Sequence, residues 1–443
     1  QAAVYARENG YMKDMPAVLL AVLARRDPVL FRTVFNRVVT HGKMLRTFVQ
    51  VVRSGQTGRK SLGSAPKAMV QAWLNTASVR ALLNANVGRD PSLADMLRMV
   101  HPKPADKSRE ALFAWVLGRP ADLTLLPQEV RDWIAFKATG EGPFPDVPFQ
   151  MLTQLPLTRE HWAQLARTGS WQMVRQSLNA FLRHGVFDDA AMVATVARKL
   201  RDPKAVAGAK AFPYQLMVAA LNVGGEMPLE IRNALHDAME LAVRNVPKVV
   251  GEVVVAPDIS GSMMSSVTGY RRGATSRVRH VDVAALVAAA FLRVNRRATV
   301  LPFHHAVVTT RLDARDTVLT NAEKLTQLGY GGTNISAPLE WLNTRHRAPD
   351  LVVFVSDNQS WVDAGPGPGT AMMRQWEVLK SANPRAKLVC VDIAPYGTTQ
   401  AAERDDVMNL GGFSDAVFRQ IAAFANDRAG PVHWVGEIAA IDD

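Results

Sequence analysis

Five oxygen-bearing side chains, at three places in the chain, could together hold a hard divalent cation. Asp258, Ser260 and Ser262 lie in one short stretch, Thr333 follows a pair of glycines, and Asp357 stands further along. All the ligand atoms would be oxygens and two of the side chains are anionic. Such a set favours Mg²⁺ over zinc, with Mn²⁺ or Ca²⁺ as alternatives. With so few charged ligands, the ion would keep water or an open position for an outside carboxylate or phosphate.

Two apolar runs place these residues at strand ends. Residues 253–256 read Val-Val-Val-Ala just before Asp258, and residues 351–355 read Leu-Val-Val-Phe-Val just before Ser356 and Asp357. Loops at the carboxyl ends of parallel strands converge, so we expect the three segments to meet. Their order resembles the metal-ion-dependent adhesion site of the von Willebrand factor A domain. A domain that keeps the turns but binds no metal is the alternative.

The C-terminal part of the chain alternates between strands and helices. Strands are expected at 250–257, 298–304, 350–356 and 387–393. Helices are expected at 281–294, 316–328, 337–346 and 370–381. This order predicts a doubly wound α/β sheet with parallel strands at its centre. We therefore assign residues 248–443 to a von Willebrand factor A-like domain.

The N-terminal part shows helical periodicity without strand alternation. Helices are expected at 15–26, 43–53, 65–75, 91–100, 108–118, 158–167, 170–184, 188–200 and 227–245. Another helix is expected after Asp27, because Pro28 suits a first helical turn. Short helices joined by brief turns commonly stack as antiparallel pairs in series. We therefore expect a HEAT-like α-solenoid over residues 1–247.

Positive charge is concentrated in one stretch of that helical part. The chain carries a net charge of +12, and residues 28–89 contain ten Lys and Arg but no Asp or Glu. A solvated face normally mixes both signs, so this stretch favours a polyanionic partner held by salt-dependent phosphate contacts. A generic basic surface is the weaker alternative.

Composition sets the broad class of the protein. The chain has 443 residues, of which 48% are hydrophobic and 21% charged, values ordinary for a globular protein with a sizeable core. Its one cysteine, Cys390, excludes a disulfide within the chain and fits a reducing compartment. No apolar run is long enough to cross a bilayer, and no signal peptide is visible. We expect a cytoplasmic monomer that does not enter a membrane.

The pairing of a basic helical module with an A domain resembles the Ro60 autoantigen family, whose helical part is the TROVE module. Residues 40–48 read Thr-His-Gly-Lys-Met-Leu-Arg-Thr-Phe and resemble a threonine-histidine helix start of that family. Residues 58–63 read Gly-Arg-Lys-Ser-Leu-Gly and precede Lys67 and Trp73, like the family's glycine-basic turn. Residues 92–104, which end in His-Pro-Lys-Pro, resemble a helix end of the family.

The resemblance implies RNA binding. In that family the helical module forms a ring closed by the A domain, and non-coding or misfolded RNA binds its basic surface with single-stranded ends entering the hole. A role in RNA quality control, as a ribonucleoprotein with an exoribonuclease as partner, is implied too. Leu93 departs from members that carry a basic residue or histidine there. The candidate RNA-binding residues are His41, Lys43, Arg46, Arg53, Arg59, Lys60, Lys67, Arg89, His101 and Lys103.

The sequence gives little support to catalysis. The stretch 260–262 lacks the residues of a nucleophile elbow, and the glycines at 329–332 lack the lysine and spacing of a nucleotide-binding loop. We therefore expect a binding protein and not an enzyme. The alternative function is a metal-dependent protein-interaction module whose A domain captures a carboxylate of an acidic partner. A metal-dependent nuclease is the least favoured reading.

Overall fold

The computed structural model describes most of the chain, and its residues form two compact units. It describes residues 1–10, 12, 14–58, 60–142, 144–209, 211–267, 277–329, 331–357, 371–394, 401–402, 404–413, 416–426, 435–436 and 438–441. Unit 1 comprises Gln1–His161 with Val432–Asp443, and unit 2 comprises Trp162–Pro431. Within the described residues no helix has both the length and the hydropathy that a membrane span requires.

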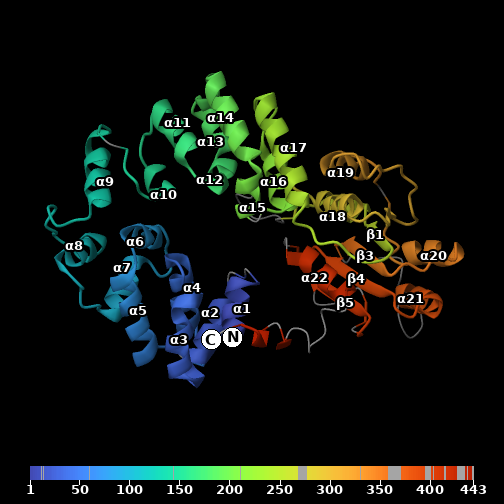
Figure 1. The fold of residues 1–443 in the computed structure, drawn as a ribbon, viewed down its shortest axis with the longest axis horizontal. Coiled ribbons are helices and arrows are strands. Elements are labelled where there is room, and N and C mark those ends of the chain that lie inside the picture. The colour runs from blue at the N-terminus through green and yellow to red at the C-terminus, as the bar shows by residue number, and fades with distance from the viewer. Residues whose placement is uncertain are drawn as a thin grey trace. The chain divides into compact units, whose positions relative to one another are not determined.

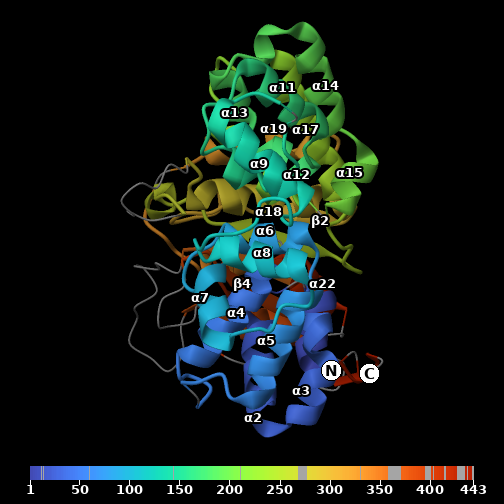
Figure 2. The same ribbon diagram turned by 90° about the vertical axis from the view of Figure 1, so that its left-hand side faces the viewer.

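Unit 1 consists of helices that follow one another through short turns. Figure 2 shows α3, α4 and α5 running side by side. The helices are α1 (Ala2–Glu8), α2 (Met15–Arg26), α3 (Pro28–Val38), α4 (Gly42–Arg53), α5 (Ser64–Thr76), α6 (Val79–Asn86), α7 (Leu93–Val100), α8 (Lys107–Val116), α9 (Gln128–Thr139) and α10 (Phe149–Leu152). A further helix, α11 (Arg159–Thr168), contains the border between the two units.

Three aromatic rings form the centre of packing in the first helices. Phe31, Phe35 and Phe48 have no exposed surface, and their ring centroids lie 5.5 to 5.7 Å apart. The carboxylate of Asp27 accepts hydrogen bonds from two main-chain N–H groups at the start of α3, which fixes where this helix begins. The helix predicted after Asp27, with Pro28 in its first turn, is confirmed.

Unit 2 begins with further helices. They are α12 (Trp171–Gln176), α13 (Leu178–Arg183), α14 (Ala190–Leu200), α15 (Pro203–Gly208), α16 (Pro213–Asn222) and α17 (Leu229–Val243), with a 3-10 turn, η1 (Val186–Asp188). The prediction of one helix over 170–184 was wrong. Ser177 separates α12 from α13, because its backbone angles, φ −104° and ψ 6°, leave the helical region.

The chain then forms a five-stranded sheet of parallel strands in the order β2-β1-β3-β4-β5. Its strands are β1 (Val253–Pro257), β2 (Ala298–Val300), β3 (Leu351–Ser356), β4 (Lys387–Asp392) and β5 (Val407–Gly411). The other elements of this part are η2 (Gly261–Met264), α18 (His280–Val294), α19 (Val318–Thr326), α20 (Ala337–Thr344), α21 (Ala371–Ala382) and α22 (Ala416–Ala425). Helices followed by a doubly wound α/β sheet are therefore confirmed as the fold class.

Helices cover both faces of this sheet, as Figure 1 shows. On one face α20 and α21 pack over side chains such as Phe354 and Cys390. On the other face Phe291 of α18 meets Phe418 of α22, with ring centroids 5.8 Å apart. Burial on both faces explains why β1 and β3 are apolar at nearly every position. Burial also raises the pKa of the Cys390 thiol above its usual range.

The last helices pack directly on the α/β part of unit 2. Phe212, before α16, stacks on Phe418 with a centroid distance of 6.4 Å. The carboxylate of Glu240 in α17 accepts a hydrogen bond from the Val318 N–H and pairs with Arg293. The border predicted at residue 247 thus marks where the strands begin, whereas the compact units divide within α11.

Candidate metal site and nucleic-acid interface

Asp258 lies at the end of β1 and has no exposed surface. Its Oδ1 accepts a hydrogen bond from the Ser260 N–H at 2.8 Å, and its Oδ2 accepts one from the Ser356 hydroxyl at 2.8 Å. Its own N–H donates to the Val355 carbonyl at 2.9 Å, which continues the pairing of β1 with β3. The carboxylate is therefore held in one orientation by both strands.

The first and second predicted loops lie against each other. The Gly261 N–H donates to the Gly331 carbonyl at 3.1 Å, and the hydroxyls of Ser260 and Ser262 are 3.2 Å apart. A Cβ at Gly329 would lie 2.8 Å from the Ile259 carbonyl oxygen, so this close approach requires glycine. Thr333, on the second loop, is 2% exposed.

Asp357 follows β3 and is also buried. The pKa of Asp258 is raised to about 6, because burial and, to a smaller extent, the charge of Asp357 outweigh the opposing hydrogen bonds from Ser260 and Ser356. The hydrogen bond from Ser356, which directly precedes Asp357, to Asp258 shows that the third loop begins next to the first. The structure therefore brings the three predicted segments together.

The residues present fit a hard cation. None of the ion pairs among the described residues involves Asp258, although its carboxylate is fully buried. Among the described residues no group of three or more His, Cys, Asp or Glu side chains could hold a metal ion, so hydroxyl oxygens would have to complete this set. Two carboxylates and three hydroxyls are the donor set that Mg²⁺ or Ca²⁺ prefers. A bound cation would offset the cost of burying these charges.

Sequence reasoning missed two neighbours of this site. Ser356 positions Asp258 through its hydroxyl, and the signal was its place directly before Asp357. His280, at the start of α18, is 8% exposed, and its Nδ1 has no hydrogen-bond partner among the described residues. Burial lowers the pKa of His280, and the charge of Asp357 opposes that shift. The histidines at 304 and 305 stack on each other beside Gly331 and were not predicted as ligands.

In unit 1 the structure collects three of the predicted cations around one pocket of about 350 Å³. Arg53, Lys60 and Lys67 line it together with Ser61, Leu62, Gly63, Ser64 and Met99. None of these three cations forms an ion pair with another described residue. The pocket includes the start of α5, whose first turn has no side-chain cap. Uncapped N–H groups and unpaired cations at one place favour an anion.

Two other candidates have structural roles. Nδ1 of His41 accepts a hydrogen bond from the Met44 N–H at 3.3 Å and so caps α4. Burial lowers the pKa of His41, and the charges of Arg7 and Lys43 lower it further, which favours the neutral capping form. Arg46 is half-buried, and its Nη2 donates to the Ala85 carbonyl at 3.5 Å.

The remaining candidates are spread over the unit. Lys43, Arg89 and Lys103 are exposed. His101 ends α7 in the left-handed conformation, with φ 47°, and lines a different pocket of about 330 Å³ with Arg98 and Arg119 among others. Arg59 lies outside the described residues. Whether each of these side chains contacts RNA stays a prediction.

Comparisons with known proteins agree with this geometry. Residues 252–425 match the family model described as the Ro60 vWA domain. A curated relative, the RNA-binding protein RO60 of Deinococcus radiodurans, is 25% identical over 360 residues, which are 75% of this chain and 66% of the relative. The aligned part is thus just under two thirds of that relative. The crystal structure of the D. radiodurans Ro (Rsr) protein matches with a TM-score of 0.70 and 23% identity, covering 93% of this chain and 87% of that chain.

The chain is similar to the bacterial Ro proteins. The region that matches the Ro60 vWA model contains all five predicted metal ligands. The pocket around Arg53, Lys60 and Lys67 lies in the helical part, outside the range of the A-domain model. The two candidate sites therefore belong to different compact units.

Proposed function

We propose that this chain binds RNA and that the cations of unit 1 contact its phosphates. The observation that carries the proposal is the pocket in which Arg53, Lys60 and Lys67 surround the uncapped start of α5. Positive charges held close together without internal counter-charges repel one another, so a phosphate bound among them is stabilised. The relative that is named for RNA binding supports RNA as the polyanion.

The proposed substrate is small non-coding RNA, and structured or misfolded RNA with single-stranded ends. Lysine and arginine contacts to phosphates do not read bases, so recognition would follow the shape and charge of the RNA. We propose that the chain acts as a ribonucleoprotein in RNA quality control, with an exoribonuclease as a partner. No catalytic step is assigned to the chain in this proposal.

A binding titration tests the RNA proposal. A labelled structured RNA with a single-stranded 3′ tail is compared with the same RNA without its tail, at two salt concentrations. Lys60→Glu and Lys67→Glu should each weaken binding roughly tenfold and lower its salt dependence, because each removes a phosphate contact. Arg385→Glu, an equal charge change at an exposed site in unit 2, is the control. Equal losses in all three variants would contradict a phosphate site at this pocket.

We further propose that the oxygen ligands of unit 2 hold a divalent cation, with Mg²⁺ as the expected ion. Asp258, Ser260, Ser262, Thr333 and Asp357 would be its ligands. Ser262 is the half-exposed member of this otherwise buried set, so an outside group would approach on its side. This opening supports the second candidate function, in which the A domain captures a carboxylate of an acidic protein through the metal.

Calorimetric titration with Mg²⁺ and Mn²⁺ tests the metal proposal. Asp258→Ala should abolish the heat of binding, and it should leave RNA binding within about twofold, because Asp258 does not line the pocket around Arg53, Lys60 and Lys67. A folded Asp258→Ala variant that loses RNA binding would contradict this separation of roles. Unchanged metal binding in that variant would exclude the site.

A further inference from the structure

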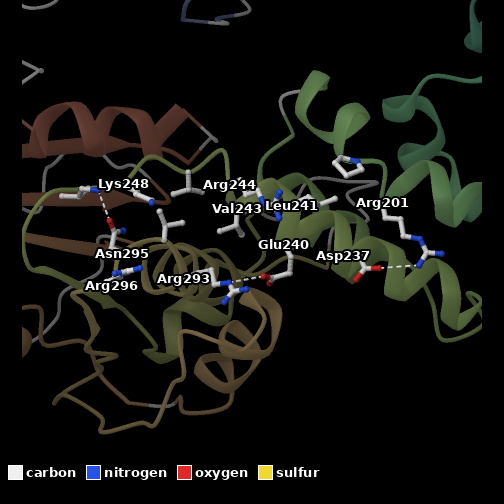
Figure 3. A pocket seen from close by; sticks show the side chains of 14 residues that line it. Arg201, Asp237, Glu240, Leu241, Val243, Arg244, Lys248, Arg293, Asn295 and Arg296 are labelled. Atoms are coloured by element: carbon white, nitrogen blue, oxygen red, sulfur yellow. Dashed lines mark hydrogen bonds and ion pairs between the residues drawn. The ribbon is translucent and has the colours of Figure 1, made fainter.

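We propose that unit 2 holds a second phosphate-binding site, which takes the phosphodiester backbone of RNA. The site is a pocket of about 1020 Å³ formed by α17, the segment 244–249 and the end of α18 (Figure 3). It deepens the RNA-binding function proposed above and rests on it. All the residues that line it belong to unit 2.

Cations outnumber carboxylates in this pocket. Its basic residues are Arg201, Arg244, Lys248, Arg293 and Arg296, and its acidic residues are Asp237 and Glu240. Both carboxylates are already engaged, as the dashed lines in Figure 3 show. Arg201 pairs with Asp237 at 3.7 Å, and Arg293 pairs with Glu240 at 3.3 Å.

Three cations are left without a counter-charge. Arg244, Lys248 and Arg296 are exposed, and none of them forms an ion pair with another described residue. Arg244 directly follows α17, so the negative end of that helix accounts for one positive charge there. Lys248 lies beyond the end of α17, and Arg296 lies beyond the end of α18. Among the described residues, neither side chain forms an ion pair that would explain its positive charge.

Hydrogen bonds of Asn295 hold two of the segments that line the pocket together. Oδ1 of Asn295 accepts a hydrogen bond from the Val249 N–H at 2.9 Å, and its Nδ2 donates to the Phe291 carbonyl at 3.0 Å. These bonds tie the segment that carries Lys248 to the end of α18, next to Arg296. The lining also includes the buried side chains of Val243, Val246 and Val249. An apolar floor lowers the local dielectric constant and so strengthens attraction between these cations and an anion.

The chemistry of the lining favours phosphates over bases. Four of its five cations are arginines, whose planar guanidinium groups match phosphate oxygens. The lining contains no aromatic side chain, so it offers no surface for stacking a base. A pocket of this size exceeds what one phosphate needs. It therefore fits a stretch of RNA backbone held without reading its sequence.

Charge-reversal variants at neighbouring positions test this site. Arg296→Glu and Lys248→Glu should each weaken binding of the structured RNA roughly tenfold and lower the salt slope by about 1. The matched control is Arg297→Glu, because Arg297 is exposed and adjacent but does not line the pocket. The control should change affinity less than about twofold. Thermal unfolding of each variant confirms that it is folded.

A local readout comes from chemical acetylation of lysines followed by mass spectrometry. RNA should protect Lys248 in the wild-type protein, and the Arg296→Glu variant should lose this protection. Equal affinities of Arg296→Glu and Arg297→Glu, with binding still weakened by Lys60→Glu, would overturn the second site but leave RNA binding intact. Absence of salt-sensitive RNA binding in the wild type would overturn both proposals. Protection of Lys248 by a polyglutamate peptide as strong as that by RNA would reassign the pocket to acidic proteins.

Discussion

At the scale of single residues, Asp258 shows how burial prepares a carboxylate for a cation. Hydrogen bonds from Ser260 and Ser356 favour its charged form, yet burial and the charge of Asp357 raise its pKa to about 6. A raised pKa means that the folded protein prefers the neutral form more than the unfolded chain does. The charged site is therefore costly for the fold until a cation binds.

Asp258→Asn should stabilise the metal-free protein at neutral pH. The pKa of Asp258 in the folded protein lies above the ordinary aspartate value of 3.8, so wild-type stability falls as the pH rises from about 4 to about 6 and then levels off. Above pH 6 the variant should gain about 3 kcal/mol in the free energy of unfolding, from a shift of this size. Denaturant unfolding in the presence of a chelator, from pH 4 to 7.5, measures the difference.

Added Mg²⁺ provides the control for this prediction. It should raise the stability of the wild type but not of Asp258→Asn, and its effect should weaken below about pH 6, because ligands must be deprotonated to bind metal. A difference between the two proteins that does not change with pH would show that the charge of Asp258 is not the cause.

The sequence predicted which oxygen-bearing segments lie together better than it predicted the contacts of individual cations. The spacing from Asp258 to Ser262 is local, and apolar runs show that it follows a strand. His41 caps its own helix through a local hydrogen bond to Met44, whereas the contact of Arg46 with α6 depends on how helices pack. The position of a basic residue within a basic stretch does not show whether its side chain binds a ligand or contacts another part of the protein.

At the scale of elements, two aspartates that precede helices offer a matched comparison. Asp27 accepts hydrogen bonds from two N–H groups of α3, whereas Asp14, at the start of α2, makes no side-chain cap. Asp27→Ala should therefore lower the free energy of unfolding by about 1 kcal/mol, and Asp14→Ala should leave it nearly unchanged. Thermal unfolding of unit 1 measures both. Equal losses would mean that a general charge effect at helix starts dominates.

Elements with strong apolar patterns were predictable, and those with weak patterns were not. The runs that form β1 and β3 are buried at every position. In β5, which was not predicted, only Val407 is buried, because this strand lies at the edge of the sheet. Helix α9 was also not predicted, since only Val130 and Phe136 are buried along it. A narrow apolar stripe gives a weak helical signal.

At the scale of the whole chain, the packing of α16 and α17 on the α/β part predicts how fragments behave. A fragment of residues 248–443 would lose the stack of Phe212 on Phe418 and the contacts of Glu240 with Val318 and Arg293. It should be less stable than a fragment of residues 162–443 by on the order of 3 kcal/mol, since an aromatic contact surface becomes exposed. Urea unfolding with binding of a hydrophobic dye compares them. Equal stability would establish residues 162–247 as a separate domain.

Sequence patterns could not predict how the chain divides into compact units. The change from helices to strands near residue 247 is visible in the composition. The contacts that join both sides of this border involve residues such as Phe212 and Phe418, which lie far apart in the chain. Periodicity describes which face of an element is apolar, but not which distant element covers that face.

The burial of Cys390 in β4 has a practical consequence. It is the only cysteine of the chain, it is 1% exposed, and burial keeps its thiol protonated. Thiol reagents react with the exposed thiolate form, so the natural protein should stay unlabelled under mild conditions. A cysteine introduced at the exposed position 56 or 297, neither of which lines a proposed RNA pocket, would then be a unique attachment point for a fluorophore. One dye in each unit would let energy transfer report, molecule by molecule, how RNA engages both pockets.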